Sequence, residues 1–142
     1  MSTETNKAVV RRYYEEVHNQ GQRDVLKEIA VEDYVEHNPF PGHGQGLAGF
    51  YQRVEMLQNA FTMNFTIEDM IAEGNKVVVR WTNHNIHHGS FLGFPATGKS
   101  AIASGIDIHL LRDGKLAEHW DVVDILSVLE QLGLLPQPHE TK

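Results

Sequence analysis

The 142-residue sequence contains no cysteine. This absence excludes disulfide cross-links, thiolate nucleophiles and cysteine-ligated metal sites. Basic residues are also scarce, with 12 Lys and Arg against 19 Asp and Glu and a formal net charge of −7. Because that charge opposes the electrostatic attraction that supplies most nucleic-acid affinity, we expect no nucleic-acid partner.

Long apolar runs are missing as well. No segment approaches the roughly 18 apolar residues of a membrane-spanning helix, so we expect no membrane partner. The first residues, MSTETNKAVVRRYYEEV, lack the apolar stretch of a signal peptide, which predicts a cytoplasmic protein. The length and the hydrophobic fraction of 41% suit one domain, expected over residues 1–142 with a frayed tail at 137–142.

Hydrophobic periodicity predicts helices first and long strands afterwards. Apolar residues recurring every three or four positions predict helices over Thr3–Asn19, Asp24–Ala30 with Asp24 as N-cap, Leu47–Phe61, and Ile125–Leu132 with Asp124 as N-cap. Alternating runs predict strands from Asn64 to the turn at Glu73 and from Lys76 to His88, before an apolar-rich loop that resembles a lid. This order predicts an α+β fold with helices on one side of a curved antiparallel sheet.

The segment from Ala101 to Asp124 predicts a β-hairpin, since two alternating runs flank Asp113-Gly114. A three-residue loop that includes Arg112 sets Ile106 across from Trp120 and pairs apolar with apolar residues. A two-residue loop sets Ile106 across from an aspartate. Because a slip of one residue moves every side chain to the other face, we predict the three-residue loop.

The two faces of this hairpin differ in character. One face is expected to carry the apolar residues Ile106, Ile108, Leu110, Leu116, Trp120 and Val122. The other gathers Asp107, His109, His119 and Asp121 among Leu111, Ala117 and Val123. Such alternation usually leaves the polar face in water. If the face is enclosed instead, two carboxylates on adjacent strands would raise at least one pKa toward neutrality, as acid/base catalysis requires.

The sequence gives little support for a metal site, a serine nucleophile or a phosphate-binding loop. His84 and His88, with His109 or His119, offer metal-binding imidazoles, but their spacing matches no familiar metal motif, and we predict no metal. No Gly-x-Ser-x-Gly nucleophile motif occurs, and Gly42-His43-Gly44-Gln45-Gly46 lacks the residues of a phosphate-binding loop.

Three segments together resemble the SnoaL-like polyketide cyclases of the nuclear-transport-factor-2-like superfamily. They are Tyr34-Val35-Glu36-His37-Asn38-Pro39, the loop HGSFLGFPATGK at 88–99, and DGKLAEHWD at 113–121. The resemblance covers essentially the whole chain. It implies a cone-shaped barrel, in which a curved, mostly antiparallel sheet wraps around N-terminal helices beside a short C-terminal helix. It also implies a deep pocket and a homodimer formed through the sheet.

The resemblance also implies an activity. Characterised members of the family close rings by cofactor-free intramolecular aldol chemistry on polyketide esters, using an aspartate near the end of the last strand. Asp121 aligns with that aspartate, and Asp107 stands where those cyclases have an assisting histidine. We therefore expect a cofactor-independent acid/base enzyme for a hydrophobic, carbonyl-bearing small molecule, with Asp121, His119 and Asp107 as catalytic residues. A non-catalytic small-molecule-binding or dimerisation module of the same fold is the alternative.

Five further residues are candidates for substrate binding. Arg80 and His84 share one face of the preceding strand and would stabilise an enolate if that face is inward, whereas an ion pair is the structural alternative for Arg80. His37 and Asn38 would approach from the pocket rim, or simply form a turn before Pro39. His109, on the polar hairpin face, completes the set.

Overall fold

The computed structural model describes residues 2–136, and the expected frayed tail at 137–142 lies outside them. The helical segments are α1 (Thr3–Arg12), η1 (Tyr13–Asn19), η2 (Arg23–Val25), α2 (Leu26–Ile29), α3 (Gly46–Ala60) and α4 (Ile125–Gln131). The strands are β1 (Ala30–Glu36), β2 (Phe61–Glu73), β3 (Lys76–His87), β4 (Ser100–Arg112) and β5 (Lys115–Val123). None of the helices within residues 2–136 is long and apolar enough to cross a membrane.

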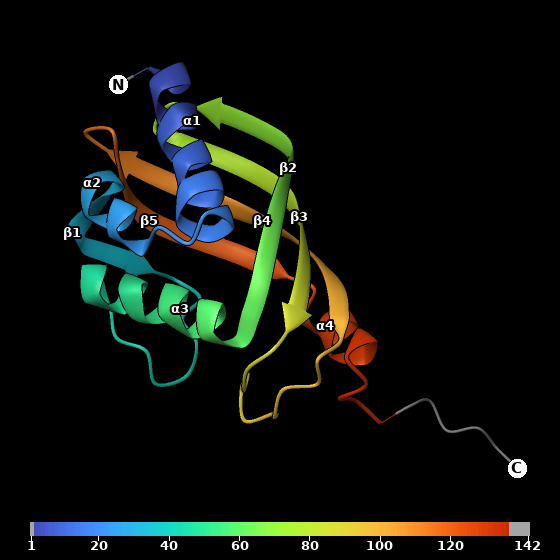
Figure 1. The fold of residues 1–142 in the computed structure, drawn as a ribbon. Helices are drawn as coiled ribbons and strands as arrows, with labels where there is room; N and C mark the ends of the chain where they lie inside the picture. The colour runs from blue at the N-terminus through green and yellow to red at the C-terminus, as the bar shows by residue number, and fades with distance from the viewer. Residues whose placement is uncertain (1, 137–142) are drawn as a thin grey trace, which may run out of the picture.

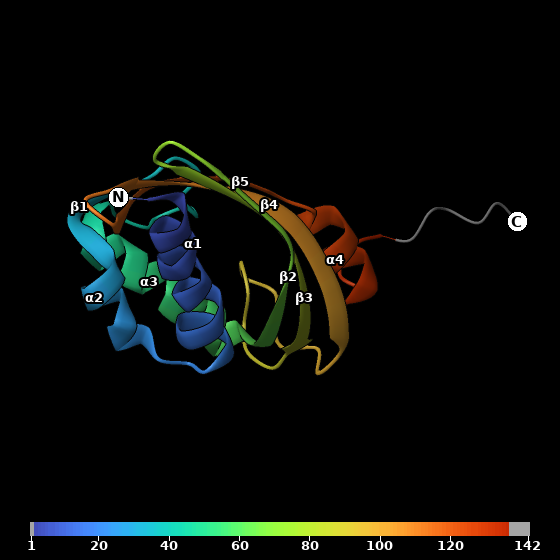
Figure 2. The ribbon, with the colours of Figure 1, turned by 90° about the horizontal axis from the view of Figure 1, so that it is seen from above.

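One curved sheet organises the fold. Its strand order is β1-β5-β4-β3-β2, with β1 parallel to β5 and the other neighbours antiparallel. Helices α1, α2 and α3 lie on the concave side, and α4 lies apart from them beside the far end of β4 (Figures 1 and 2). The predicted α+β fold, with a curved, mostly antiparallel sheet around N-terminal helices, is confirmed. The sheet stays open, since β1 and β2 are its edges.

The N-terminal helix covers the predicted Thr3–Asn19, but its second half is π-helical. In η1 the buried residues come in adjacent pairs, Tyr13 with Tyr14 and Val17 with His18. A π-helical turn holds more residues than an α-helical turn and often occurs at functional sites. This segment therefore presents several buried aromatic side chains to the concave face of the sheet.

The second predicted helix has the expected length but lies one residue earlier, at 23–29, and its predicted cap is wrong. The first turn begins at Arg23 without a side-chain cap, because the Asp24 carboxylate accepts a hydrogen bond from the Tyr51 hydroxyl at 3.1 Å instead. The helix ends at Ile29, since Ala30 already pairs with Leu116 of β5. The sequence predicted extended backbone near Pro39 but no strand here. The partner of β1 lies more than 80 residues away, where no local pattern indicates it.

The β4–β5 hairpin forms, but the predicted three-residue loop is wrong. The loop consists of Asp113 and Gly114, both with positive φ, and Arg112 pairs with Lys115. Positive φ at both loop residues is the geometry that matches the twist of the flanking strands. Asp-Gly therefore closes the turn in two residues.

A β-bulge then shifts the register by one residue, in the direction opposite to the shift that the predicted loop would have produced. Leu116 pairs with Leu111, but the register shifts before Leu110, and Ala117 is the extra residue on β5. Leu116 therefore lies on the inner face with Leu111 rather than on the predicted outer face. Farther along, the predicted partners Ile106 and Trp120 are wrong by two residues, since Trp120 pairs with Ile108. A shift of two positions preserves the face, so the four polar residues still point the same way.

Candidate active site

A cavity of about 300 Å³ lies between the concave face of the sheet and the helices. Most of its lining is apolar, and charged groups are concentrated on one wall, where Arg53, Asp107 and Asp121 reach it. The two aspartates face each other on β4 and β5. The polar face of the hairpin is thus enclosed: Asp107 is 4% exposed and His119 is 1% exposed.

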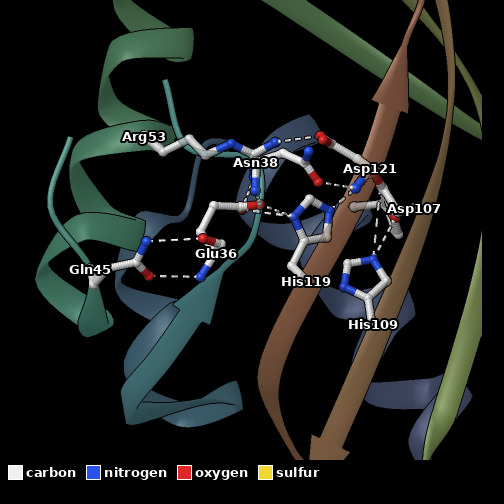
Figure 3. A network of polar contacts seen from close by, with 9 residues as sticks. Glu36, Asn38, Gln45, Arg53, Asp107, His109, His119 and Asp121 are labelled. Atoms are coloured by element: carbon white, nitrogen blue, oxygen red, sulfur yellow. Dashed lines mark hydrogen bonds and ion pairs between the residues drawn. The ribbon is translucent and has the colours of Figure 1, made fainter. Parts of the chain in front are cut away.

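His119 lies between two carboxylates (Figure 3). Its Nδ1 is 2.7 Å from Oε1 of Glu36, and its Nε2 is 3.1 Å from Oδ1 of Asp107. Since both acceptors are carboxylates, both ring nitrogens donate. Burial lowers the pKa of His119, but its hydrogen bonds to Asp107 and Glu36 more than offset this and raise the pKa to about 9. His119 is therefore a buried imidazolium at neutral pH.

Asp107 is surrounded by donors. Burial favours its neutral form, but the hydrogen bond and charge of His119 outweigh burial and lower its pKa, with help from the Tyr14 hydroxyl. The Tyr14 oxygen is 2.7 Å from Nε2 of His109. Because Tyr14 donates to Asp107, His109 must donate to Tyr14. Burial lowers the pKa of His109 to about 3, so this second imidazole is neutral.

Asp121 has a different environment. Its carboxylate accepts a hydrogen bond from Nη2 of Arg53 at 3.0 Å, and its backbone N–H donates to Oδ1 of Asn38 at 3.0 Å (Figure 3). Burial raises the pKa of Asp121, and the opposing effect of Arg53 does not cancel that rise. The two facing aspartates are therefore shifted in opposite directions, as environments of unequal polarity require.

The charges of this cluster favour a proton on Asp121. Arg53 also lies 3.3 Å from Glu36, so three carboxylates share two cations, Arg53 and His119. With every group ionised the cluster carries one excess negative charge. Among the three carboxyl groups the pKa is lowered for Glu36 and Asp107 and raised only for Asp121. Asp121 is thus the group that exchanges a proton most readily.

Sequence reasoning missed Glu36, Arg53 and Gln45. The side chain of Gln45 accepts from the Glu36 N–H at 2.8 Å and donates to the Glu36 carbonyl at 2.9 Å, which fixes the end of β1 (Figure 3). Arg53 carried a usable signal, because it interrupts the apolar stripe of α3 between Phe50 and Val54. A lone arginine on a buried helix face usually has a carboxylate partner.

Three of the predicted binding residues lie outside the cavity. Arg80 and His84 are exposed on the outer face of β3, so the inward orientation on which their predicted role in substrate binding depended does not occur. Strand alternation turns Val79 and Trp81 inward instead, and Arg80 pairs with Asp69 at 2.6 Å. His37 turns away from the cavity and stacks on Trp120, with ring centroids 4.3 Å apart.

Of the remaining predicted residues, Asn38 lines the cavity, as do Asp107 and Asp121. His109 and His119 are buried directly behind the wall. Among the apolar neighbours predicted for this face, Val123 reaches the cavity, while Leu111 and Ala117 are buried beside it without lining it.

A metal ion would find three possible ligands here. Nitrogen and oxygen atoms of Asp107, His109 and His119 lie within 4.8 Å of one another. However, both nitrogens of His119 already face carboxylates, and Nε2 of His109 is bonded to Tyr14. His84 and His88, which the sequence offered as possible ligands but whose spacing argued against a metal site, are exposed and take no part in this cluster. These imidazole nitrogens are therefore engaged in hydrogen bonds, which favours protons over a metal ion at the cluster of Asp107, His109 and His119.

Comparison with known proteins identifies the family. The chain is 35% identical over 134 residues to the aklanonic acid methyl ester cyclase DauD of Streptomyces sp. (strain C5), covering 88% of this chain and 80% of that protein. It is 32% identical to the nogalonic acid methyl ester cyclase of Streptomyces nogalater, covering 81% and 88%. The structure of TsrD from Streptomyces laurentii matches with a TM-score of 0.85 at 28% identity, covering 95% and 99%. The sequence model of SnoaL-like polyketide cyclases matches residues 8–132, and the chain belongs to that family.

Proposed function

We propose that the protein is a cofactor-independent polyketide cyclase that closes a ring by intramolecular aldol addition, with Asp121 as acid and base. One observation carries the proposal: a carboxyl group of raised pKa lies on the wall of a largely apolar cavity, paired with a buried arginine. The relatives act on methyl esters of aklanonic and nogalonic acid. A hydrophobic polyketide ester with a ketone within reach of its own activated carbon is the corresponding substrate.

The reaction needs one proton to move twice. Ionised Asp121 removes a proton from the carbon next to the ester carbonyl, and the C–H electron pair passes into the enolate. That carbon then bonds to the ketone carbon, and the ketone oxygen takes the displaced π electrons. Asp121 returns its proton to this oxygen, so the product is an isomer of the substrate. The guanidinium of Arg53 stabilises the negative charge that develops beside it.

His119 and Asp107 support this chemistry from behind. His119 does not line the cavity, and it acts as a positioning residue through its hydrogen bond to Asp107. Asp107 stays ionised, so its charge opposes ionisation of the facing Asp121 and strengthens Asp121 as a base. In this pair Asp107 provides a fixed negative charge, and Asp121 carries the proton.

The test is turnover of aklanonic acid methyl ester, followed by chromatography and mass spectrometry. The wild-type protein should yield a new isomer of unchanged mass. Asp121→Asn keeps the size and the hydrogen bond from Arg53 but cannot carry the proton, so its rate should fall about 10²-fold or more with an unchanged circular dichroism spectrum. A wild-type rate no higher than that of buffer, or an equally active Asp121→Asn, would contradict the proposal.

We further propose that two copies associate through the outer face of the sheet. Ile102, Ile106 and Val122 are 51%, 48% and 77% exposed there, and the last two pair directly across β4 and β5. Adjacent exposed apolar side chains of this size are typical of protein interfaces. A second copy with the same face would cover them.

A further inference from the structure

The cavity extends well beyond the charged wall, and polar residues line this remote part as well. Asn83 and Asn85 lie on the inner face of β3, are 6% and 5% exposed, and line the cavity. Their partners in register on β4 are Ala103 and Ala101. These small side chains leave room in front of the two amides.

The polar groups in this region have few partners in the described part of the chain. Asn85 makes no side-chain hydrogen bond there, and its Oδ1 is buried and unpaired. Asn83 uses Oδ1 to accept from the backbone N–H of Asn64 at 3.1 Å, which leaves its NH₂ group available. Buried polar groups without partners cost free energy, so they are unusual unless water or a ligand completes them.

His18 adds a third polar side chain to the cavity lining. It comes from the π-helical segment η1, is 5% exposed and has an unpaired Nδ1. Its ring packs against Phe65 at 4.9 Å and Tyr13 at 4.7 Å between centroids, which fixes its orientation. None of the three residues contacts the cluster around Asp121 by a hydrogen bond in the described part of the chain.

The distance between the two polar regions limits the shape of a ligand. Asp107 pairs with Val79, and Asn83 lies four residues farther along β3. At roughly 3.3 Å per residue this is about 13 Å along the strand. A molecule that reaches both regions through an apolar cavity must be elongated and polar at its remote edge.

Resting on the proposed function, we propose that Asn83 and Asn85 form a second recognition site, which binds hydroxyl or carbonyl oxygens on the remote edge of a fused-ring aromatic substrate. The reacting carbon then lies at Asp121, and the apolar rings fill the space between. The site discriminates among polyketides of similar size by their oxygen pattern, because an unsubstituted edge would leave the amides unpaired.

The experiment compares two rigid probes, 9,10-anthraquinone and 2,6-dihydroxy-9,10-anthraquinone, by quenching of tryptophan fluorescence. Trp81 lines the cavity and serves as the reporter. The wild-type protein should bind the dihydroxy probe about ten-fold more tightly or better. Asn85→Leu removes the amide at nearly constant size. It should weaken binding of the dihydroxy probe about ten-fold while leaving the affinity for anthraquinone unchanged. Asn59→Leu, the same change at an exposed position outside the cavity, should alter neither affinity.

The recognition site is refuted if the wild-type protein binds both probes equally, a result that needs no variant to fold. It is also refuted if Asn85→Leu weakens both probes alike. Neither probe carries a reactive side chain, so the result does not depend on turnover. Discrimination without ring closure would leave the recognition site standing and overturn the proposed reaction. Ring closure without discrimination would do the reverse.

Discussion

Asp107 and Asp121 face each other across two strands, yet their neighbours give them opposite properties. Asp107 accepts hydrogen bonds from the His119 imidazolium and Tyr14, and its pKa is lowered. The Asp121 carboxylate accepts a hydrogen bond from the Arg53 guanidinium, and burial keeps its pKa raised. Pairs of carboxyl groups separated in this way are typical of acid/base sites.

Replacing His119 by glutamine tests the buried imidazolium through stability. The pKa of His119 rises from 6.5 to about 9 on folding, so the folded chain retains a proton that the unfolded chain releases between these values. The free energy of unfolding should therefore fall as the pH rises from 6.5 to about 9, by on the order of 3 kcal/mol. His119→Gln should be less stable at pH 6.5 and should lack this decline. Urea unfolding across that range measures both proteins, and parallel pH profiles would rule out a protonated His119.

At the scale of elements, Gln45 links the start of α3 to the edge of the sheet. Its amide pairs with both backbone groups of Glu36, in the way that a further strand would. This arrangement fixes the residue that holds Nδ1 of His119. The position of the buried network therefore depends on a side chain at the N-terminus of a helix.

Gln45→Leu should accordingly lower the free energy of unfolding by about 1 to 2 kcal/mol, since two backbone hydrogen bonds are lost. Gln52→Leu provides the matched control, because Gln52 accepts a single exposed bond from Gly44 and its loss should cost less. Chemical unfolding of both variants gives the comparison. Equal costs would show that Gln45 does not secure the edge.

Prediction from sequence succeeded for those features that depend only on the periodicity of apolar residues. The spacing of apolar residues gave the helices at Thr3–Asn19 and Leu47–Phe61 within a few residues, and alternation placed the polar groups of the hairpin on one face. The bulge at Ala117 was not predicted, because Ile106 meets an apolar partner both in the predicted register, across from Trp120, and in the observed one, across from Val122. Arg53 and Glu36 escaped because their partners lie on distant elements, which a local pattern cannot indicate.

At the scale of the whole molecule, the concave face and the outer face of the curved sheet have different roles. The helices cover its concave face (Figure 2), where the cavity lies, whereas its outer face exposes apolar residues of β4 and β5. The same alternation that gathers Asp107 and Asp121 inside places Ile106 and Val122 outside. One hairpin therefore serves both the site and the proposed interface.

Val122→Glu tests that interface by placing a charge at its most exposed apolar residue. We expect a wild-type dimer and a monomeric variant in sedimentation velocity, because a buried unpaired carboxylate is costly. Leu92→Glu, at an exposed leucine in the loop after β3, should remain dimeric. A monomeric wild-type protein, or a Val122→Glu variant that still dimerises, would exclude this face.

The central claim is that two enclosed aspartates are set to opposite proton affinities. The most direct measurement is an NMR pH titration of the side-chain carboxyl carbons of Asp107 and Asp121, with Asp107→Asn and Asp121→Asn used for assignment. We predict that Asp121 titrates above the ordinary aspartate pKa and Asp107 below it, and that Asp107→Asn lowers the pKa of Asp121. Two ordinary titrations that ignore each other, or the opposite order, would contradict the account.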